Sequence, residues 1–167
     1  YIKEEMNLFK SEKDRYSQEQ LSAREAQRQA EYIAWSPVIF QVSRLMVKWG
    51  VLDELRNSGE GLTIGELKQK TSLSEYALKI LLEASLSAGT ILINTETDRY
   101  TISKTGWFLL NDPATRVNMD FNHDVNYRGL FYLDEALAEG KPAGLKTLGN
   151  WKTIYEGLAE LEPQVQQ

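Results

Sequence analysis

The fold is decided by residues 63–104, which read TIGELKQKTSLSEYALKILLEASLSAGTILINTETDRYTISK. Thr63 is a suitable N-cap for a short helix that continues to Lys70. Ser72, with Glu75 three residues on, has the form of a capping box that opens a second helix. The second helix is expected to be buried over most of its surface, since its apolar or small positions are Leu73, Ala77, Leu78, Ile80, Leu81, Leu82, Ala84, Ser85 and Ala88.

The second helix is followed by two β-prone runs. Gly89 is a suitable left-handed residue just past the end of that helix. The two runs are residues 91–93 and 99–102, and the turn-rich segment 94–98 joins them. Helix, helix and β-hairpin in this order predict a winged helix-turn-helix within a mainly α chain.

A strongly apolar helix is predicted just upstream, over residues 37–56. Ser36 is expected to cap this helix and Pro37 to take its first position. Its apolar residues cover more than one face, so it needs cover on two sides. The winged-helix unit can cover one side, and either the polar N-terminal segment or a second subunit can cover the other. The size of two indole side chains favours a second subunit, with predicted contacts at Trp35, Ile39, Val42, Leu45 and Trp49.

The remaining segments are also expected to be helical. Residues 1–31 are polar and dense in charge, which is typical of a helix that is solvated or lies against a partner. Short helices are predicted over residues 107–110 and 125–139, the latter ending at Gly140, and a last one is built on Trp151 and the apolar residues that follow it.

The composition excludes several kinds of chemistry. The 167 residues include no cysteine, which removes disulfides, thiolate metal sites and cysteine nucleophiles, and fits a reducing compartment such as the cytoplasm. A single histidine leaves only carboxylates as further metal ligands and gives no placed catalytic triad, so no metal site and no catalytic residue is predicted. No apolar run approaches the roughly 20 residues of a membrane span, and no membrane partner is expected.

The charge balance argues against nucleic acid as a partner. The chain carries 19 basic and 24 acidic residues, a formal net charge of −5. Over residues 63–101 the charge is 4 − 5 = −1, because Lys68, Lys70, Lys79 and Arg99 stand against Glu66, Glu75, Glu83, Glu96 and Asp98. Phosphates would be repelled by the helix and wing that would have to touch them.

Several short motifs occur in a familiar order: LDEL at 52–55, LTIGEL at 62–67, LLEA at 81–84, YTIS at 100–103, LDEAL at 133–137, GKPAG at 140–144 and NW at 150–151. Together they resemble the dimerisation domain of S-adenosylmethionine-dependent O-methyltransferases of plant and bacterial natural-product pathways, over about residues 33–163. In that family a winged helix is kept as a dimerisation module, so the resemblance implies a homodimer.

The resemblance also implies that this domain covers a pocket for a small-molecule methyl acceptor. The candidate pocket residues are His123, Tyr127, Phe131 and Trp151. A surface histidine in a turn is the alternative for His123, and a role in the core is the alternative for the aromatic residues.

The resemblance stops short of the family's catalytic Rossmann-like domain. The sequence contains no G-x-G-x-x-G, so S-adenosylmethionine is expected to bind to a C-terminal domain absent from this chain. No cofactor-binding residue is predicted, and this fragment alone is expected to be inactive.

The expected organisation has three parts: a polar N-terminal helix (1–31), a dimerisation and winged-helix domain (32–111) and a helical connector (112–167). The main alternative function is that of a winged-helix transcriptional regulator which dimerises through its N-terminal helices, and a further one is that of a pure interaction module.

Overall fold

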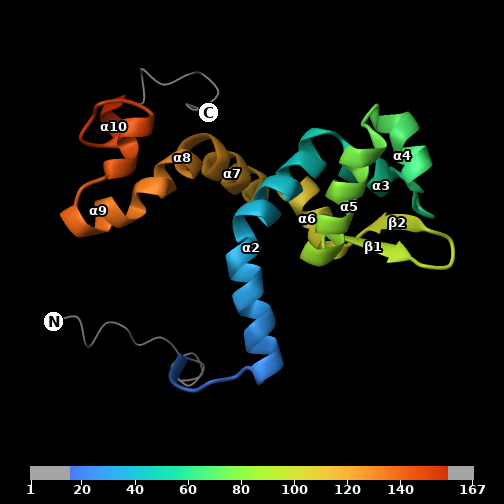
Figure 1. Ribbon diagram of the computed structural model, residues 1–167. Helices are drawn as coiled ribbons and strands as arrows, with labels where there is room; N and C mark the ends of the chain where they lie inside the picture. Colours follow the sequence, from blue (N-terminus) through green and yellow to red (C-terminus); the bar gives the residue numbers. More distant parts are fainter. Residues whose placement is uncertain (1–15, 158–167) are drawn as a thin grey trace. The chain divides into compact units, whose positions relative to one another are not determined.

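The computed structural model describes residues 16–157 (Figure 1). Residues 1–15 of the predicted polar helix 1–31 and the part of the predicted last helix after residue 157 lie outside these residues. The contacts within the chain divide it into two units, residues 1–41 and residues 42–167. Within the described residues the fold is mainly helical with one two-stranded antiparallel hairpin, which confirms the predicted fold class.

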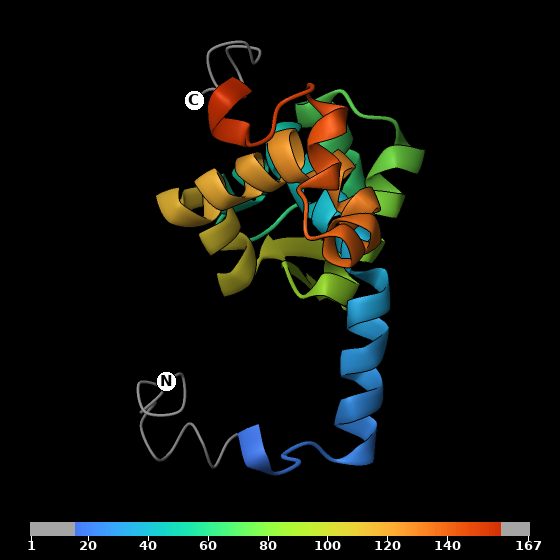
Figure 2. The ribbon, with the colours of Figure 1, turned by 90° about the vertical axis from the view of Figure 1, so that its left-hand side faces the viewer.

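Helix α2 (Ala23–Lys48) is drawn as one uninterrupted ribbon in Figures 1 and 2, although it contains Pro37. The predicted helix start at Ser36 and Pro37 is therefore wrong. Proline has no N–H to donate to the carbonyl of Ile33 one turn earlier, and the Ser36 hydroxyl donates to that carbonyl instead, over 2.8 Å. The helix begins after Ser22, whose hydroxyl accepts from the backbone N–H of Glu25 at 3.4 Å.

The predicted helix 37–56 is also not continuous. Helix α2 ends at Lys48, and α3 (Val51–Asn57) starts after Gly50, which has the left-handed φ of 72°. The left-handed region is open to glycine at little cost, so the chain can turn here between two helices.

The helix–helix–hairpin order is confirmed in the second unit. Helix α4 (Ile64–Thr71) opens with a complete capping box between Thr63 and Glu66, and α5 (Glu75–Ala88) ends at Gly89 with φ 72°. Strands β1 (Ile91–Asn94) and β2 (Arg99–Ile102) pair in antiparallel register.

The predicted capping box of Ser72 and Glu75 is wrong. Helix α4 extends through Thr71, so the backbone of Ser72 is used as its left-handed C-cap, with φ 57°. Ser74 is the extended residue before α5, and its hydroxyl accepts from the backbone N–H of Ala77 at 3.1 Å. The connection between the two helices is therefore three residues long.

A third short extended segment joins the hairpin. Leu62 and Tyr100 form an isolated antiparallel bridge, with N···O distances of 2.9 and 2.8 Å. Gly61 has a φ of 80°, and a Cβ at this position would lie 2.5 Å from the carbonyl oxygen of Tyr100. Only glycine therefore allows this close approach.

The core of the second unit lies between the end of α2, helices α3 to α5, the hairpin and the segment Lys104–Asn111 that follows it. It consists of Val42, Met46, Val51, Leu52, Leu55, Leu62, Leu67, Leu78, Leu81, Leu82, Ile91 and Leu110. Burial of these side chains is the main force that holds the helices and the hairpin together.

The segment after the hairpin is helical but irregular. It consists of α6 (Lys104–Asn111), α7 (Pro113–Phe121), the π-helical η1 (Asn122–Asn126), α8 (Tyr127–Gly129), the 3₁₀-helical η2 (Leu130–Tyr132), α9 (Leu133–Glu139), the 3₁₀-helical η3 (Ala143–Thr147) and α10 (Ile154–Gly157). The helix end predicted at Gly140 is confirmed. The short helix predicted over residues 107–110 lies within α6, which begins three residues earlier and includes Asn111.

The single amphipathic helix predicted over 125–139 is wrong. Its hydrogen-bond ladder is interrupted at Tyr132, whose φ of −110° and ψ of 21° lie outside the helical region. The irregular turns bring α8 against η3, where Gly129 and Gly144 meet so closely that a Cβ on Gly144 would lie 2.6 Å from the carbonyl oxygen of Gly129.

Candidate functional site

The five predicted subunit contacts lie in two different environments. Trp35 is 63% exposed in the first unit, on a part of α2 that also exposes Tyr32, Ile33 and Val38. In the second unit Val42 is only 8% exposed and belongs to the core, Leu45 packs against that core, and Trp49 is 41% exposed at the end of α2. Ile39 is half-buried.

The apolar surface on α2 is therefore shorter than the sequence predicted. It is formed by Tyr32, Ile33, Trp35 and Val38, all close to half exposed or more, and is called the α2 stripe below. Tyr32 and Ile33 were missed because the predicted helix began only at Pro37. Val38 lies within the predicted helix but was not among the predicted contacts. A helix that runs through Pro37 presents them on the same element as Trp35.

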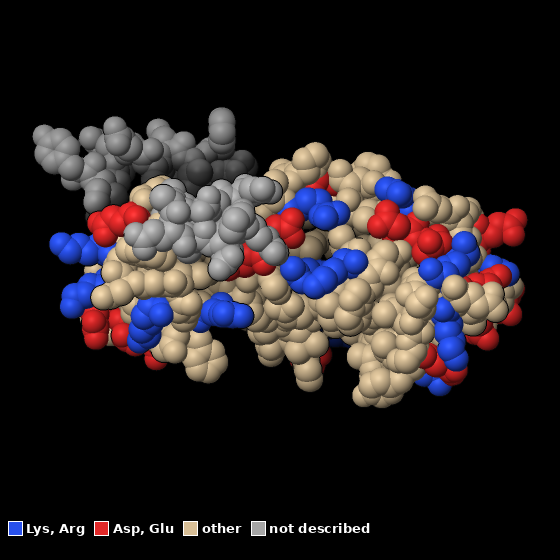
Figure 3. All heavy atoms as spheres, turned by 90° about the horizontal axis from the view of Figure 1, so that it is seen from above, with Lys and Arg blue, Asp and Glu red and all other residues tan. Residues whose placement is uncertain are grey.

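The basic residues of the helix–helix–hairpin unit are mostly held in ion pairs. Arg99 lies 3.2 Å from Glu66, Lys70 lies 3.2 Å from Glu54, and the more loosely placed Lys79 lies 3.8 Å from Glu75. On the face drawn in Figure 3, basic and acidic side chains lie interspersed.

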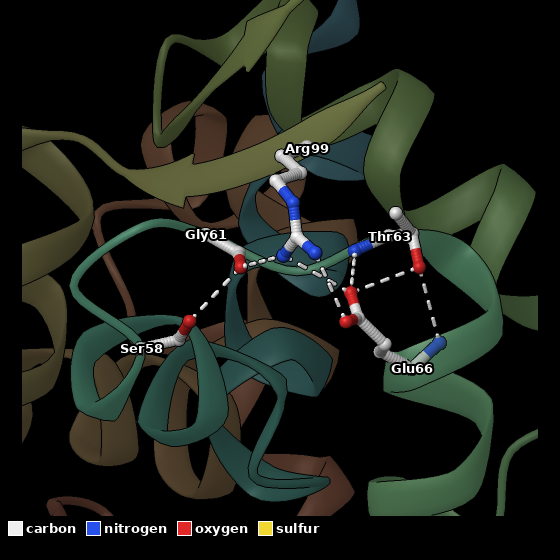
Figure 4. Close-up of polar contacts among 5 residues, drawn as sticks. All are labelled: Ser58, Gly61, Thr63, Glu66 and Arg99. Carbon is white, nitrogen blue, oxygen red and sulfur yellow. Dashed lines mark hydrogen bonds and ion pairs between the residues drawn. The ribbon is translucent and has the colours of Figure 1, made fainter. Parts of the chain in front are cut away.

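Arg99 makes the most extensive of these contacts (Figure 4). Its guanidinium donates to both carboxylate oxygens of Glu66 at 3.2 Å and to the carbonyl of Gly61 at 2.7 Å. The backbone N–H of Thr63, then its hydroxyl, and then Arg99 hold the pKa of Glu66 below its ordinary value. The side chain of Arg99, on β2, is therefore bound to the first turn of α4.

The wing itself is electrostatically negative. Burial raises the pKa of the Tyr100 phenol, and the charges of Asp98 and Glu83 raise it further. These two carboxylates come from the wing turn and from α5, the two places where a DNA reader needs positive charge.

Two cavities lie in the C-terminal part of the second unit. The larger, of about 540 Å³, is lined by Glu135, Glu139, Lys141, Pro142, Ala143, Leu145, Lys146, Gly149, Asn150, Trp151 and Lys152. The smaller, of about 390 Å³, is mostly apolar and is lined by Phe121, Val125, Asn126, Gly129, Leu130, Leu133, Ala136, Pro142, Gly144, Leu145, Leu148, Thr153 and Ile154.

Of the four predicted pocket residues, Trp151 lines the larger cavity. Its indole lies against two glycines, since a Cβ on Gly149 or on Gly157 would lie 2.3 Å from the ring. Phe131 is 89% exposed and lines neither cavity. The residues of the smaller cavity were not predicted, and their signal was the apolar periodicity of the segment 125–139.

His123 and Tyr127 lie together outside both cavities. Their rings are stacked with centroids 6.4 Å apart and planes at 25°. His123 also lies 2.8 Å from the carboxylate of Asp124. The structure therefore brings two of the four predicted residues together and leaves Phe131 and Trp151 apart from them.

Metal ligands and membrane spans were searched over the described residues. No group of three or more His, Cys, Asp or Glu side chains that could hold a metal ion occurs within residues 16–157. In the same part of the chain, no helix combines the length and the apolar character needed to cross a bilayer.

Part of the chain matches a protein-family model. Residues 27–100 match the family model of the Dimerisation2-like domain, a range that begins in α2 and ends in β2. Among curated proteins, none matches the chain significantly.

Three solved structures share the fold. The S-adenosylmethionine-dependent methyltransferase SibL in its apo form has a TM-score of 0.69 at 19% identity, covering 81% of this chain and 40% of that one. LepI in complex with SAM has a TM-score of 0.70 at 17% identity, covering 93% and 40%. Human N-acetylserotonin methyltransferase in complex with SAM has a TM-score of 0.63 at 21% identity, covering 86% and 43%. The chain thus spans about two fifths of each of these proteins.

Proposed function

We propose that the chain is the N-terminal dimerisation domain of an S-adenosylmethionine-dependent methyltransferase, because its residues 27–100 match the family model of the Dimerisation2-like domain. The observation that carries the proposal is the extent of the family match. It includes both the exposed α2 stripe and the helix–helix–hairpin unit, so the surface and the fold of a dimerisation module occur together.

In this proposal the chain pairs two identical subunits through the α2 stripe and covers the pocket of a small-molecule methyl acceptor. The organisation into a polar N-terminal helix, a dimerisation domain and a connector after residue 111 belongs to the same proposal. Transfer to an oxygen atom is supported by the resemblance of the sequence motifs to O-methyltransferases.

S-adenosylmethionine is assigned to a catalytic domain outside residues 1–167. The described residues do not fit this cofactor, because their sheet is a single antiparallel hairpin whose turn, residues 95–98, is without glycine. A dinucleotide-type site needs a parallel strand that ends in a glycine-rich loop before a helix. We therefore expect calorimetry of this chain with the cofactor to show no heat of binding, and binding with one cofactor per chain would contradict the assignment.

The dimer is tested by sedimentation equilibrium. We expect the wild-type chain to be dimeric at micromolar concentration and Trp35→Glu to be monomeric, because a carboxylate in an apolar interface would lose its hydration. Tyr76→Glu is the matched control, since Tyr76 is 77% exposed on α5 and lies outside the α2 stripe.

Two results would count against the proposal. A wild-type chain that remains monomeric at these concentrations would remove its basis, and a dimer that survives Trp35→Glu but not Tyr76→Glu would place the interface on α5. Circular dichroism of each variant shows whether the fold is retained.

A further inference from the structure

The first half of α2 is exposed to solvent on almost all sides. Residues 24–38 are exposed except for the half-buried Ala26, and all of them belong to the first unit. An isolated helix of about 15 residues is only marginally stable in water, and Pro37 lowers the stability of this one further. A second surface that packs against this half of α2 would therefore stabilise it.

Three apolar side chains lie along one side of this exposed helix. Tyr32, Trp35 and Val38 follow one another at steps of three residues, so they are neighbours on the helix surface, and they are 49%, 63% and 46% exposed. Ile33, the remaining member of the α2 stripe, lies on the opposite side of the helix from Trp35. The apolar face formed by the three residues is therefore about two turns long, with Trp35 at its centre.

This apolar face ends for a different reason on each side. Toward the N-terminus, residues 24–31 include two arginines and two glutamates. Toward the C-terminus, Val42 belongs to the core of its own subunit and is only 8% exposed. The surface of a second subunit can therefore bury the whole apolar face only if the contact is centred on Trp35.

Two-fold symmetry determines which residues meet in such a contact. Most homodimers are two-fold symmetric, and the same patch is then used on both subunits. When the patch is the face from Tyr32 to Val38, the largest apolar overlap is reached with its middle residue on the axis. Trp35 then meets the partner's Trp35.

The charges before the apolar face determine the relative direction of the two helices. In a parallel pair, Arg24, Arg28 and Glu31 would each face their own copy, and like charges at this range repel. In an antiparallel pair the two charged segments extend in opposite directions from the axis, and Tyr32 meets the partner's Val38. The distribution of charge along α2 therefore favours the antiparallel pair.

We propose that two copies of α2 cross in antiparallel orientation with Trp35 on the two-fold axis. The inference rests on the proposed function, and it adds the position of the axis and the direction of the helices to the dimer. The occupant of the apolar face is a second copy of this chain, because the face is its own complement under a two-fold rotation and the charged segments on either side of it are kept apart.

Spin labels on single cysteines test this geometry, because the chain has no cysteine of its own. Ala23→Cys, Gln29→Cys and Ala34→Cys place a label at exposed positions of α2 outside the apolar face. In an antiparallel pair centred on Trp35, the two copies of these positions are separated along the helix axis by about 36, 18 and 3 Å, at a rise of about 1.5 Å per residue. We therefore expect the distances between subunits, measured by electron paramagnetic resonance, to decrease in this order.

Two results would overturn the inference. Equal short distances for all three labels would show a parallel pair, and distances that do not decrease toward Ala34 would place the axis elsewhere. Sedimentation equilibrium of each labelled variant shows that a dimer is being measured, and if one label prevents association, the order of the other two distances still decides. A wild-type chain that remains monomeric contradicts the proposed function and this inference together, whereas a dimer with equal distances contradicts only this inference.

Discussion

At the scale of single residues, the carboxylate of Glu66 links the start of α4 to the wing. It accepts from the backbone N–H of Thr63 at 2.8 Å, from the Thr63 hydroxyl at 3.0 Å and from Arg99 of β2. Arg99 continues the network to the carbonyl of Gly61, which also accepts from the Ser58 hydroxyl at 2.9 Å (Figure 4). One carboxylate thus serves a helix cap and a contact between elements 33 residues apart in sequence.

This network predicts a dependence of stability on pH. The pKa of Glu66 is lowered in the folded state, first by the backbone N–H of Thr63. A lowered pKa stabilises the fold above the ordinary glutamate pKa of about 4.3, and the contribution is lost as the pH falls through the lowered value. We expect Glu66→Gln to lose less stability than the wild type between neutral pH and about pH 3, as measured by urea unfolding.

The control for this measurement is Glu60→Gln, since Glu60 is an exposed residue in the turn before α4. It should follow the wild-type curve. Equal losses in the wild type and Glu66→Gln would show that the carboxylate of Glu66 is not held by its neighbours in solution.

A second prediction at this scale concerns Gly106 in α6. A Cβ at this buried position would lie 2.1 Å from the carbonyl oxygen of Thr90 and 3.0 Å from Ile102. We expect Gly106→Ala to lower the free energy of unfolding by about 1–3 kcal/mol, as overpacking does.

Gly65→Ala is the matched control for Gly106→Ala. Its Cβ would meet only the Thr63 hydroxyl oxygen, at 3.9 Å, and alanine is the better helix former in α4. We expect this variant to gain about 0.5–1 kcal/mol. Both values follow from chemical denaturation, and a fully stable Gly106→Ala would contradict the close approach of α6 to Thr90.

At the scale of elements, the passage of α2 through Pro37 is the least expected feature. A proline inside a helix costs about 3 kcal/mol, because it removes one hydrogen bond and its ring crowds the preceding turn. The Ser36 hydroxyl offsets part of this cost by donating to Ile33. Because residues 24–38 are almost all exposed, little tertiary packing supports this half of α2.

Pro37→Ala should therefore slow hydrogen exchange of the amides between residues 26 and 36. The reason is that alanine restores the N–H donor to the Ile33 carbonyl and removes the clash of the ring. Ser36→Ala, with Pro37 retained, is the companion variant and should exchange faster in the same turn. If Pro37→Ala left exchange unchanged or faster, the helix would begin at Pro37, as the sequence alone predicted.

At the scale of the whole molecule, the charges determine which partners the helix–helix–hairpin unit can bind. Three of its four basic residues are in ion pairs, with Lys70, Lys79 and Arg99 each facing a glutamate. The net charge of the chain is −5. Non-specific binding to DNA depends on basic residues that replace counterions, and typical dissociation constants are about 10⁻⁴ to 10⁻⁶ M.

We expect no salt-sensitive binding to random duplex DNA at physiological ionic strength. A fluorescence anisotropy titration at about 50 mM salt, repeated at about 200 mM, measures this. Micromolar binding that weakens steeply between the two salt concentrations would support the alternative function as a transcriptional regulator. The wing and α5 would then have to rearrange to free their basic residues.

The sequence by itself determined the elements whose beginning and end carry a local signal. The cap of α4 at Thr63, the end of α5 at Gly89 and the turn at 94–98 each depend on residues within one helical turn of one another. The turn is closed by the side chain of Asn94, which accepts from the backbone N–H groups of Glu96 and Thr97. Such signals are readable because the groups that satisfy each backbone end are neighbours in sequence.

The resemblance to a known family could also be recognised from the sequence, because each motif that carried it is a short run of neighbouring residues. Three of the motifs that carried it, at 52–55, 62–67 and 81–84, lie within the family match at residues 27–100, and the motif at 100–103 begins at its last residue. The motifs at 133–137, 140–144 and 150–151 lie beyond that match, in a part of the chain that the fold comparison with the solved structures also covers in large measure.

The tertiary structure decided what depends on competition between several local signals or on distant contacts. Ser72 and Ser74 are both good caps. In the fold α4 continues through Thr71, so Ser72 is its C-cap and Ser74 is the N-cap of α5, while Leu67 and Leu78 of the two helices lie in the core. On α2, Val42 and Trp35 are equally apolar in sequence. One enters the core and the other stays exposed, because only the fold specifies what packs against each turn of the helix.

The candidate site also combines a feature that the sequence predicts with features that only the tertiary structure decides. The spacing of His123 and Tyr127 by four residues predicts that they share a helix face, and their stacked rings are consistent with this. The pairing of His123 with Asp124 occurs in the π-helical turn η1, and the exposed Phe131 lies in the 3₁₀-helical turn η2. Trp151, which lines the larger cavity, comes after η3. Helix α8 also packs against η3, where Gly129 meets Gly144. A pattern of regular helical period cannot contain a contact between segments that are separated along the chain.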